Sequence, residues 1–195
     1  MLTYLAAVLL LLRWSAADRV ICTLGFDITS YNAYSDQRPS PDAMQLAGPV
    51  NASLAAACSP NCPRISLFRN RTAANAMLIA SGGTSKIVYR PEFFTTLYEA
   101  YGEPAIQVIL AHELGHAIDG ATPAGWIKQE WGPELRADAW TGCALSRLGL
   151  TARGLKAALE VLSKYPPLSA PHWAARLDAL RMGFAHCGGD ESKLR

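Results

Sequence analysis

The stretch that most constrains this chain is His112-Glu113-Leu114-Gly115-His116, in which two histidines stand four residues apart. Residues with this spacing lie on one face of an α-helix, so both imidazoles would point toward a single position. The pattern is typical of two ligands to one metal ion, with Glu113 beside them as a candidate general base. The alternative is a pair of buried structural histidines that bind no metal.

The flanking residues predict that this stretch belongs to a buried helix. Pro104 suits a first helical turn and Gly120 suits a helix end, so a helix is expected over residues 105–119. Apolar side chains surround it on nearly every side, as in a central helix. An unpaired carboxylate in such a setting is costly, and a metal would resolve that conflict. Gly115 costs about 1 kcal/mol relative to alanine, which indicates that another element packs closely against it.

A second pair of acidic residues follows in Glu134-Leu135-Arg136-Ala137-Asp138. A helix that starts here would place Glu134 and Asp138 one turn apart on the same face. Glu134 is the candidate third metal ligand. Asp138 is the candidate acceptor for the outer ring N–H of a ligating histidine, with His112 as the expected partner. The alternative is an exposed carboxylate pair on an ordinary helix.

Together, residues 112–116 and 134–138 resemble the gluzincin class of zinc metallopeptidases. The chain places Asn75-Ala76 first, then a strand, a helix and the helix over residues 105–119 that carries the two histidines, called the ligand helix below. This order is similar to that in the catalytic core of the HtpX and CAAX-endopeptidase type. It is also similar to that of minimal neutral zinc metallopeptidases of bacteria. The likeness covers roughly residues 65–180, which is most of the chain.

The resemblance implies one zinc ion per chain, held by His112, His116 and Glu134. A fourth position would remain for water, whose pKa zinc lowers toward ~7. Glu113 would take a proton from this water and pass it to the leaving amine. The expected activity is hydrolysis of peptide bonds in a peptide or unfolded protein. The substrate is expected to lie along a strand at 77–80 or at 86–89.

One position departs from the family pattern. These families commonly place His-Pro six residues before an Arg-Ile/Leu-x-x-Leu sequence. Residues 176–180 match the second part, but Ala170-Pro171 stands where His-Pro is expected. His172 and Arg176 are therefore candidate catalytic residues, and Arg176 has a structural ion pair as its alternative role. With Tyr89, they are also the candidate donors to the oxyanion of the reaction.

The predicted fold class is α+β, and the resemblance implies a zincin-like arrangement. Three short runs have strand-like composition and are expected to form an antiparallel meander, at residues 65–68, 77–79 and 86–89. The other predicted helices run from Ser40 through Leu46, over 52–58, 92–101, 133–148 and 151–165, and from Pro171 onward. The sheet is expected to cover the ligand helix, with further helices behind it.

The N-terminus has the features of an export signal. Residues 2–12 form an apolar run that is shorter than the ~20 residues a membrane-spanning helix needs, and Ser15-Ala16-Ala17 supplies small residues for cleavage before Asp18. We therefore expect a signal peptide over 1–17, a metallopeptidase domain over 18–195, and a periplasmic or secreted protein with no stable membrane span. An uncleaved anchor is the alternative, because no basic residue precedes the apolar run.

Five cysteines in an exported chain predict disulfides with one thiol left over. The interpretation adopted pairs Cys58 with Cys62 and Cys143 with Cys187, which leaves Cys22 free. A structural zinc site that uses Cys58, Cys62 and His186-Cys187 is the rival interpretation, although its spacing is not standard. The net charge of only +2 gives no support to a nucleic-acid partner.

Two other functions are compatible with the motifs. In the first, the same zinc site serves binding or stability in a non-catalytic module that captures peptides, as a chaperone does. In the second, the chain is a latent enzyme in which the segment near Cys22 covers the zinc through its spare thiol. Trp126 and Trp131, between the two motifs, are expected either to pack over the ligand helix or to line a substrate cleft.

Overall fold

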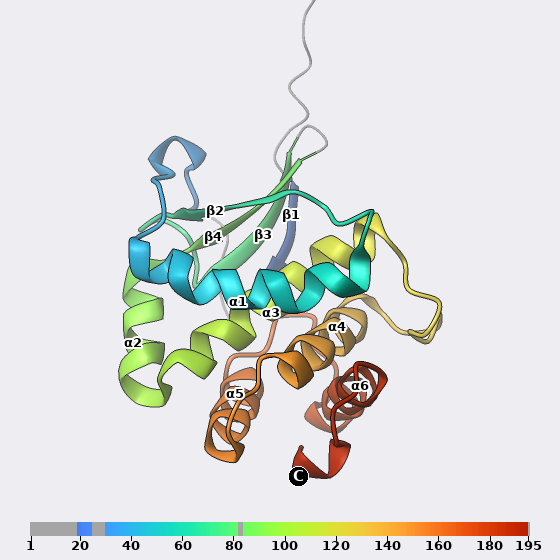
Figure 1. The fold of residues 1–195 in the computed structure, drawn as a ribbon. Coiled ribbons are helices and arrows are strands. Elements are labelled where there is room, and N and C mark those ends of the chain that lie inside the picture. The colour runs from blue at the N-terminus through green and yellow to red at the C-terminus, as the bar shows by residue number, and fades with distance from the viewer. Residues whose placement is uncertain (1–18, 25–29, 82–83, 195) are drawn as a thin grey trace, which may run out of the picture.

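The computed structural model describes residues 19–24, 30–81 and 84–194, which form a four-stranded sheet, six α-helices and two short 3-10 helices (Figure 1). In chain order these are β1 (Arg19–Thr23), η1 (Ala33–Ser35), α1 (Pro41–Cys58), β2 (Ile65–Arg69), β3 (Ala76–Ser81), β4 (Thr84–Tyr89), α2 (Pro91–Tyr101), α3 (Glu103–Ala121), α4 (Pro133–Arg147), α5 (Ala152–Lys164), α6 (Trp173–His186) and η2 (Glu191–Lys193). The predicted signal segment 1–17 lies outside the described residues. No helix among those described is long and apolar enough to cross a membrane.

The sheet has the strand order β1-β3-β4-β2, and it is mixed. β3 runs antiparallel to both β1 and β4, whereas β2 runs parallel to β4. The predicted meander is therefore wrong, because β4 lies between β2 and β3. The three strand positions were predicted within a few residues, but a fourth strand forms at β1, where none was expected. The physical reason is burial: Met77, Leu78 and Ile79 of β3 are almost fully buried, so this strand needs a neighbour on each side.

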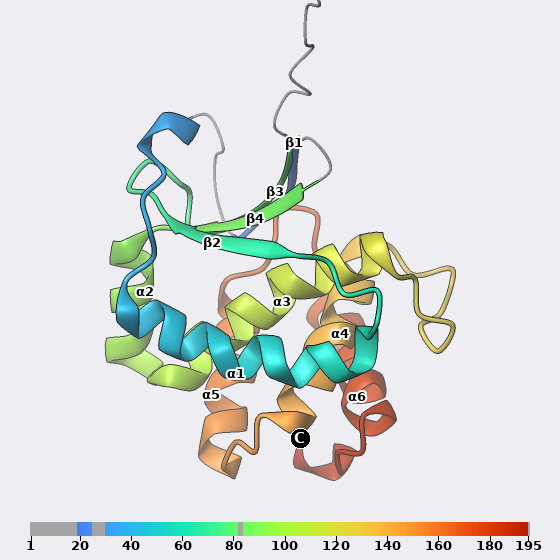
Figure 2. The same cartoon turned by 45° about the horizontal axis from the view of Figure 1, so that its top comes forward.

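The six α-helices lie on one side of the sheet (Figures 1 and 2), and six α-helices with a four-stranded mixed sheet agree with the predicted α+β class. α3 runs directly beneath the sheet. α1 lies beside α3, and α4 and α5 pack against α3 on the side away from the sheet (Figures 1 and 2). α6 packs against α4 in turn. All residues from Ala105 to Ile118 of α3 are buried, as its apolar surroundings in the sequence predicted.

The close packing expected at Gly115 is also present. A Cβ atom added to Gly115 would lie only 2.8 Å from the carbonyl oxygen of Ala137 in α4. The missing side chain thus lets the backbones of α3 and α4 approach each other. This contact brings the first turn of α4 next to the two histidines.

Residues 41–58 form one continuous helix rather than two shorter pieces. Ser40 caps it as predicted, because its side chain accepts a hydrogen bond from the Ala43 amide. Pro49 lies inside the helix and removes one backbone hydrogen bond. Leu46, Val50 and Leu54, spaced four residues apart, are buried in the core. The packing of these three side chains against the core keeps the helix continuous across Pro49.

Both predicted disulfides are present, Cys58–Cys62 and Cys143–Cys187. The first closes the end of α1, and the second joins α4 to the residue after α6. The rival zinc site at these cysteines is therefore wrong, since their sulfurs are bonded to each other. Among the described residues, Cys22 is the free cysteine, and it is buried. The disulfides are consistent with an oxidising, exported location.

Candidate metal centre

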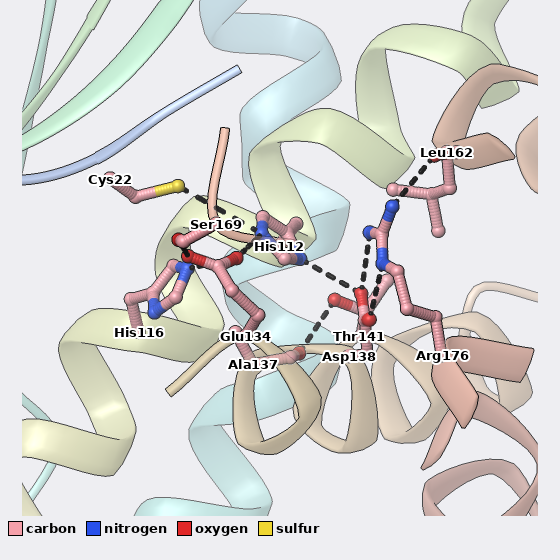
Figure 3. A network of polar contacts seen from close by, with 10 residues as sticks. All are labelled: Cys22, His112, His116, Glu134, Ala137, Asp138, Thr141, Leu162, Ser169 and Arg176. Atoms are coloured by element: carbon pink, nitrogen blue, oxygen red, sulfur yellow. Dashed lines mark hydrogen bonds and ion pairs between the residues drawn. The ribbon is translucent and has the colours of Figure 1, made fainter. Parts of the chain in front are cut away.

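Four buried side chains from three parts of the chain meet beneath the sheet (Figure 3). His112 and His116 project from α3, Glu134 comes from the first turn of α4, and Cys22 comes from β1. One ligand atom from each, namely two imidazole nitrogens, a carboxylate oxygen and a thiol sulfur, lies within 4.8 Å of all the others. This cluster of Cys, His, His and Glu could bind a metal ion.

The spacing of the donor atoms fits a single ion. Glu134 Oε2 lies 3.2 Å from His112 Nε2 and 3.3 Å from His116 Nε2. Cys22 Sγ lies 4.0 Å from His112 Nε2. Around a tetrahedral ion with bonds of about 2.0–2.3 Å, ligand atoms are separated by roughly 3.3–3.8 Å. His116 Nε2 is buried, and its only described polar contact is the one with Glu134 Oε2, which falls short of hydrogen-bond geometry, so this nitrogen faces the other donor atoms.

Local sequence explains why three of these donors meet. The two histidines face the same way because they lie one turn apart, and their rings are 4.8 Å apart at their centroids. Pro133 occupies the first turn of α4, so Glu134 stands at the beginning of that helix. The glycine at position 115 then allows α4 to approach α3 closely enough for Glu134 to reach both rings.

Asp138 and Arg176 lie behind His112, on the side away from the donor cluster. Asp138 Oδ1 is 3.1 Å from His112 Nδ1, which leaves the Nε2 atom facing the cluster. The Arg176 guanidinium donates two hydrogen bonds to this carboxylate, 2.7 and 2.9 Å long, and a third to the Leu162 carbonyl, 2.8 Å long. Both charged residues are almost fully buried. Arg176 therefore holds Asp138 in place and does not point at the donor cluster.

The electrostatics of the cluster follow from burial and pairing. Burial disfavours the imidazolium of His112, but the hydrogen bonds with Asp138 and Glu134 outweigh burial and raise its pKa to about 9. Burial also disfavours the Glu134 carboxylate, yet its contacts with His112 and His116 hold its pKa well below the usual range. Without a metal, the cluster is thus held together by ion pairs, and a metal that binds must displace the proton of His112.

Glu113 is the unusual group of the site. Its side chain is fully buried, and neither carboxylate oxygen has a well-formed hydrogen bond among the described residues, although the Cys22 thiol and the two histidines are its polar neighbours. Burial raises the pKa of Glu113 above its ordinary value, although the neighbouring His112 and His116 act in the opposite direction. Burying such a carboxyl group is destabilising, and this one lies next to a cluster that could bind a metal ion.

Ser169 belongs to this site but was not identified from the sequence. Its hydroxyl donates a hydrogen bond of 3.3 Å to Glu134 Oε1, which leaves Oε2 turned toward the histidines. Ser169 follows α5, in a segment where Pro167 forms an antiparallel bridge with Leu24. An isolated serine in a loop gives no sequence signal for such a contact.

The other candidate residues have partners elsewhere. His172 is exposed at the start of α6. The Tyr89 hydroxyl contacts Ser40, and its ring stacks on Phe94. Neither residue has a described contact with the donor cluster. Trp126 packs against Trp140 of α4 and stacks on His186 of α6, and Trp131 is also partly buried against the core, so both side chains pack, although the described ring contacts of Trp126 are with α4 and α6 and not with the ligand helix α3.

Comparison of the chain with protein-family models, with curated proteins and with solved structures gives no match. The function is therefore inferred from the residues of the site. Those residues offer three or four donor atoms for one metal ion, a buried carboxyl group beside them, and a buried pair that orients one imidazole.

Proposed function

We propose that this protein is an exported zinc metallopeptidase of zincin-like fold that hydrolyses peptide bonds in peptides or unfolded proteins. The observation that carries the proposal is Glu113, a fully buried carboxyl group with no well-formed hydrogen bond, which neighbours two histidines whose nitrogens belong to the donor cluster. A site that only binds a structural metal has no need of such a group.

Zinc is the metal proposed because of the donor types. His112, His116 and Glu134 would hold the ion through two nitrogens and one oxygen, a set that catalytic zinc sites commonly use. The buried, compact arrangement suits tetrahedral coordination more than the larger shells of oxygen ligands that calcium and magnesium require. We expect one zinc ion per chain.

The reaction then assigns a role to each residue. Bound zinc would lower the pKa of water and polarise the peptide carbonyl. Glu113 takes a proton from the attacking water and donates it to the leaving amine, and burial supports this role because it raises the pKa of the group toward that of a general base. Asp138 keeps the Nε2 lone pair of His112 directed at the ion, and Arg176 keeps Asp138 in position.

A second candidate function is a non-catalytic module with a closed metal site. Cys22 favours it, because its sulfur would complete four protein ligands and leave no position for water. The buried Glu113 favours the peptidase. The two functions predict different results for replacement of Glu113. It abolishes hydrolysis if the protein is a peptidase, and it changes only stability if the protein is a non-catalytic module.

The decisive test compares hydrolysis of casein by the wild-type chain and by Glu113→Gln, each with its zinc content measured. The comparison is repeated in the Cys22→Ser background, because the thiol belongs to the donor cluster. We expect chelator-sensitive cleavage in at least one background and a loss of about 100-fold or more on Glu113→Gln with zinc still bound.

Glu160→Gln, an exposed position on α5, is the matched control and should cleave like its parent. Equal cleavage by a parent and its Glu113→Gln variant would contradict the proposed mechanism. Zinc binding without cleavage in either background would favour the closed, non-catalytic site.

A further inference from the structure

A substrate was expected along residues 77–80 or 86–89; the second segment lies in β4, which is flanked by β3 and β2, and strand β1 occupies the edge of the first, in β3. β1 pairs antiparallel with β3, so that Cys22 lies opposite Leu78 and Thr23 opposite Met77. Residues 77–80 belong to the segment that was predicted to receive an extended peptide. A peptide that adds to a sheet edge is held by the same backbone hydrogen bonds as a strand of the protein itself. The edge of β3 beside the donor cluster is thus already taken.

A β-bulge turns Cys22 toward the donor cluster. Val20 pairs with Ile79 and Cys22 pairs with Leu78, so Ile21 is an extra residue in β1. Ile79 and Val20 belong to the small apolar cluster on the outer face of the sheet, whereas Leu78 and Cys22 belong to the main core that includes α3. Without the extra residue, the alternation of side chains would place Cys22 on the same face as Val20, away from the histidines.

The residue after β1 is held from both sides. The Leu24 amide donates to the Ala76 carbonyl, 3.1 Å away, and the Asn75 side chain donates to the Leu24 carbonyl, 2.9 Å away. Leu24 also pairs with Pro167, in the segment that carries Ser169. These contacts bind both polar backbone groups of Leu24 and hold Cys22 at the cluster, where its side chain is 4% exposed.

We infer that Cys22 Sγ is the fourth ligand of the metal and that β1, by lying on the edge of β3, keeps the peptidase latent. The inference deepens the proposed function and depends on it. Its support is geometric: Cys22 Sγ lies 4.0 Å from His112 Nε2 and within 4.8 Å of the other donor atoms, and the bulge at Ile21 aims it there.

One displacement would remove both obstacles to substrate. When β1 leaves β3, the sulfur leaves the metal and the β3 edge becomes free to pair with an extended peptide. The thiol loses a proton to solvent when it binds the metal and regains one when it leaves, so the step requires no oxidant or reductant. The occupant that replaces β1 is an extended peptide segment, which is the substrate class of the proposed function.

The sulfur ligand is tested by metal spectroscopy, which does not depend on activity. Zinc X-ray absorption of the wild-type protein should give one sulfur ligand at about 2.3 Å. The cobalt-substituted protein should show a sulfur-to-cobalt charge-transfer band that Cys22→Ser abolishes and Thr23→Ser, on the same strand, retains. A first shell of nitrogen and oxygen alone in the wild-type protein would overturn the inference, and this measurement needs no variant to fold.

Latency is tested by casein hydrolysis with folded, metal-loaded proteins. If the competent form is at most about 10% of the wild-type population, Cys22→Ser and Cys22→Ala should cleave roughly tenfold faster or more. Thr23→Ser should cleave like wild type, and Glu113→Gln added to Cys22→Ser should abolish the gain. Equal rates for wild type and both Cys22 variants would overturn latency and leave the peptidase intact. A sulfur ligand with no cleavage by any of these proteins would overturn both.

Discussion

Asp138 Oδ1 lies 3.1 Å from Nδ1 of His112, on the opposite side of the imidazole from the donor cluster. The same carboxylate accepts two hydrogen bonds from Arg176. A buried chain of three side chains therefore joins α6 through α4 to the ligand helix α3 (Figure 3). The orientation of a candidate metal ligand and the packing of the C-terminal helices depend on the same carboxylate.

Asp138→Asn should weaken both metal binding and stability. The amide is a poorer acceptor for the His112 N–H, and it leaves the buried Arg176 guanidinium without its ionic partner. Loss of such a supporting contact lowers metal affinity by about 10–100-fold, and a broken buried ion pair costs up to about 3–5 kcal/mol. Zinc affinity from competition with a chelator and unfolding in urea measure the two effects.

Asp178→Asn is the matched control on α6. Its side chain is 72% exposed, and its contact with Arg181 is 3.7 Å long. The change should alter stability by less than about 0.5 kcal/mol and leave zinc affinity unchanged. Similar losses in Asp178→Asn and Asp138→Asn would show that Asp138 has no special relationship to His112.

Gly115→Ala should weaken metal binding although it touches no ligand. The added methyl group would meet the Ala137 carbonyl oxygen at 2.8 Å, so α4 must move away from α3 and carry Glu134 with it. We expect a loss of about 1–3 kcal/mol in stability and a lower zinc affinity. Gly120→Ala, on an exposed part of the same helix with open space around it, should instead stabilise by up to about 1 kcal/mol. An unchanged zinc affinity in Gly115→Ala would refute this role of the glycine.

The two disulfides should differ in their contributions to stability. Cys143 and Cys187 are 44 residues apart in sequence, and Cys58 and Cys62 are 4 apart. The loss of entropy in the unfolded chain corresponds to about 4 kcal/mol for the long loop and about 2 kcal/mol for the short one. Urea unfolding of the two double alanine variants measures the difference, and an equal loss in both would contradict the entropic explanation.

A polar cluster around Asp36 should make the free energy of unfolding fall as pH rises through the alkaline range. The Asp36 carboxylate accepts hydrogen bonds from the Tyr31 hydroxyl, the Lys86 ammonium and the Asn70 amide, at 2.9, 2.9 and 2.7 Å. Burial disfavours the ammonium, but its contacts with Tyr31 and Asp36 outweigh burial and raise the pKa of Lys86. A raised pKa contributes stability that is complete below the ordinary lysine value of ~10.4 and is lost as pH rises above it.

Asp36→Asn should therefore lower the free energy of unfolding by about 1–3 kcal/mol at neutral pH. The difference in free energy of unfolding between variant and wild type should narrow above about pH 10.4, because the unfolded wild-type chain then loses the Lys86 proton that the folded chain retains. Urea unfolding at a series of pH values measures the difference. A constant difference across this range would exclude Lys86 as the group responsible.

Local residue patterns were sufficient to predict most of the helices and three of the strand positions, whereas the disulfide pairing, which joins Cys143 to a cysteine 44 residues away, was an interpretation that the structure confirms. The local patterns worked because helix caps, apolar periodicity and strand composition act over a few residues. The order of the strands was predicted wrongly. The composition of β2, β3 and β4 is similar, so the sequence carries no signal that β4 lies between the other two, and the order is set by how the strands pair in the fold. Two short helices were predicted where α1 is continuous, because tertiary packing outweighs the backbone hydrogen bond lost at Pro49.

The sequence by itself determined that His112 and His116 share one helix face, with Glu113 beside them, because helical geometry follows from local spacing. Only the tertiary structure decided how distant groups join them. The approach of α4 at Gly115 brings in Glu134, the fold of α6 brings Arg176 to Asp138, and a single extra residue in β1 turns Cys22 toward the histidines. The second motif predicted Glu134 and Asp138 as partners of the histidines, but their contacts, and those of Arg176 and Cys22, form only when the helices and strands pack against one another.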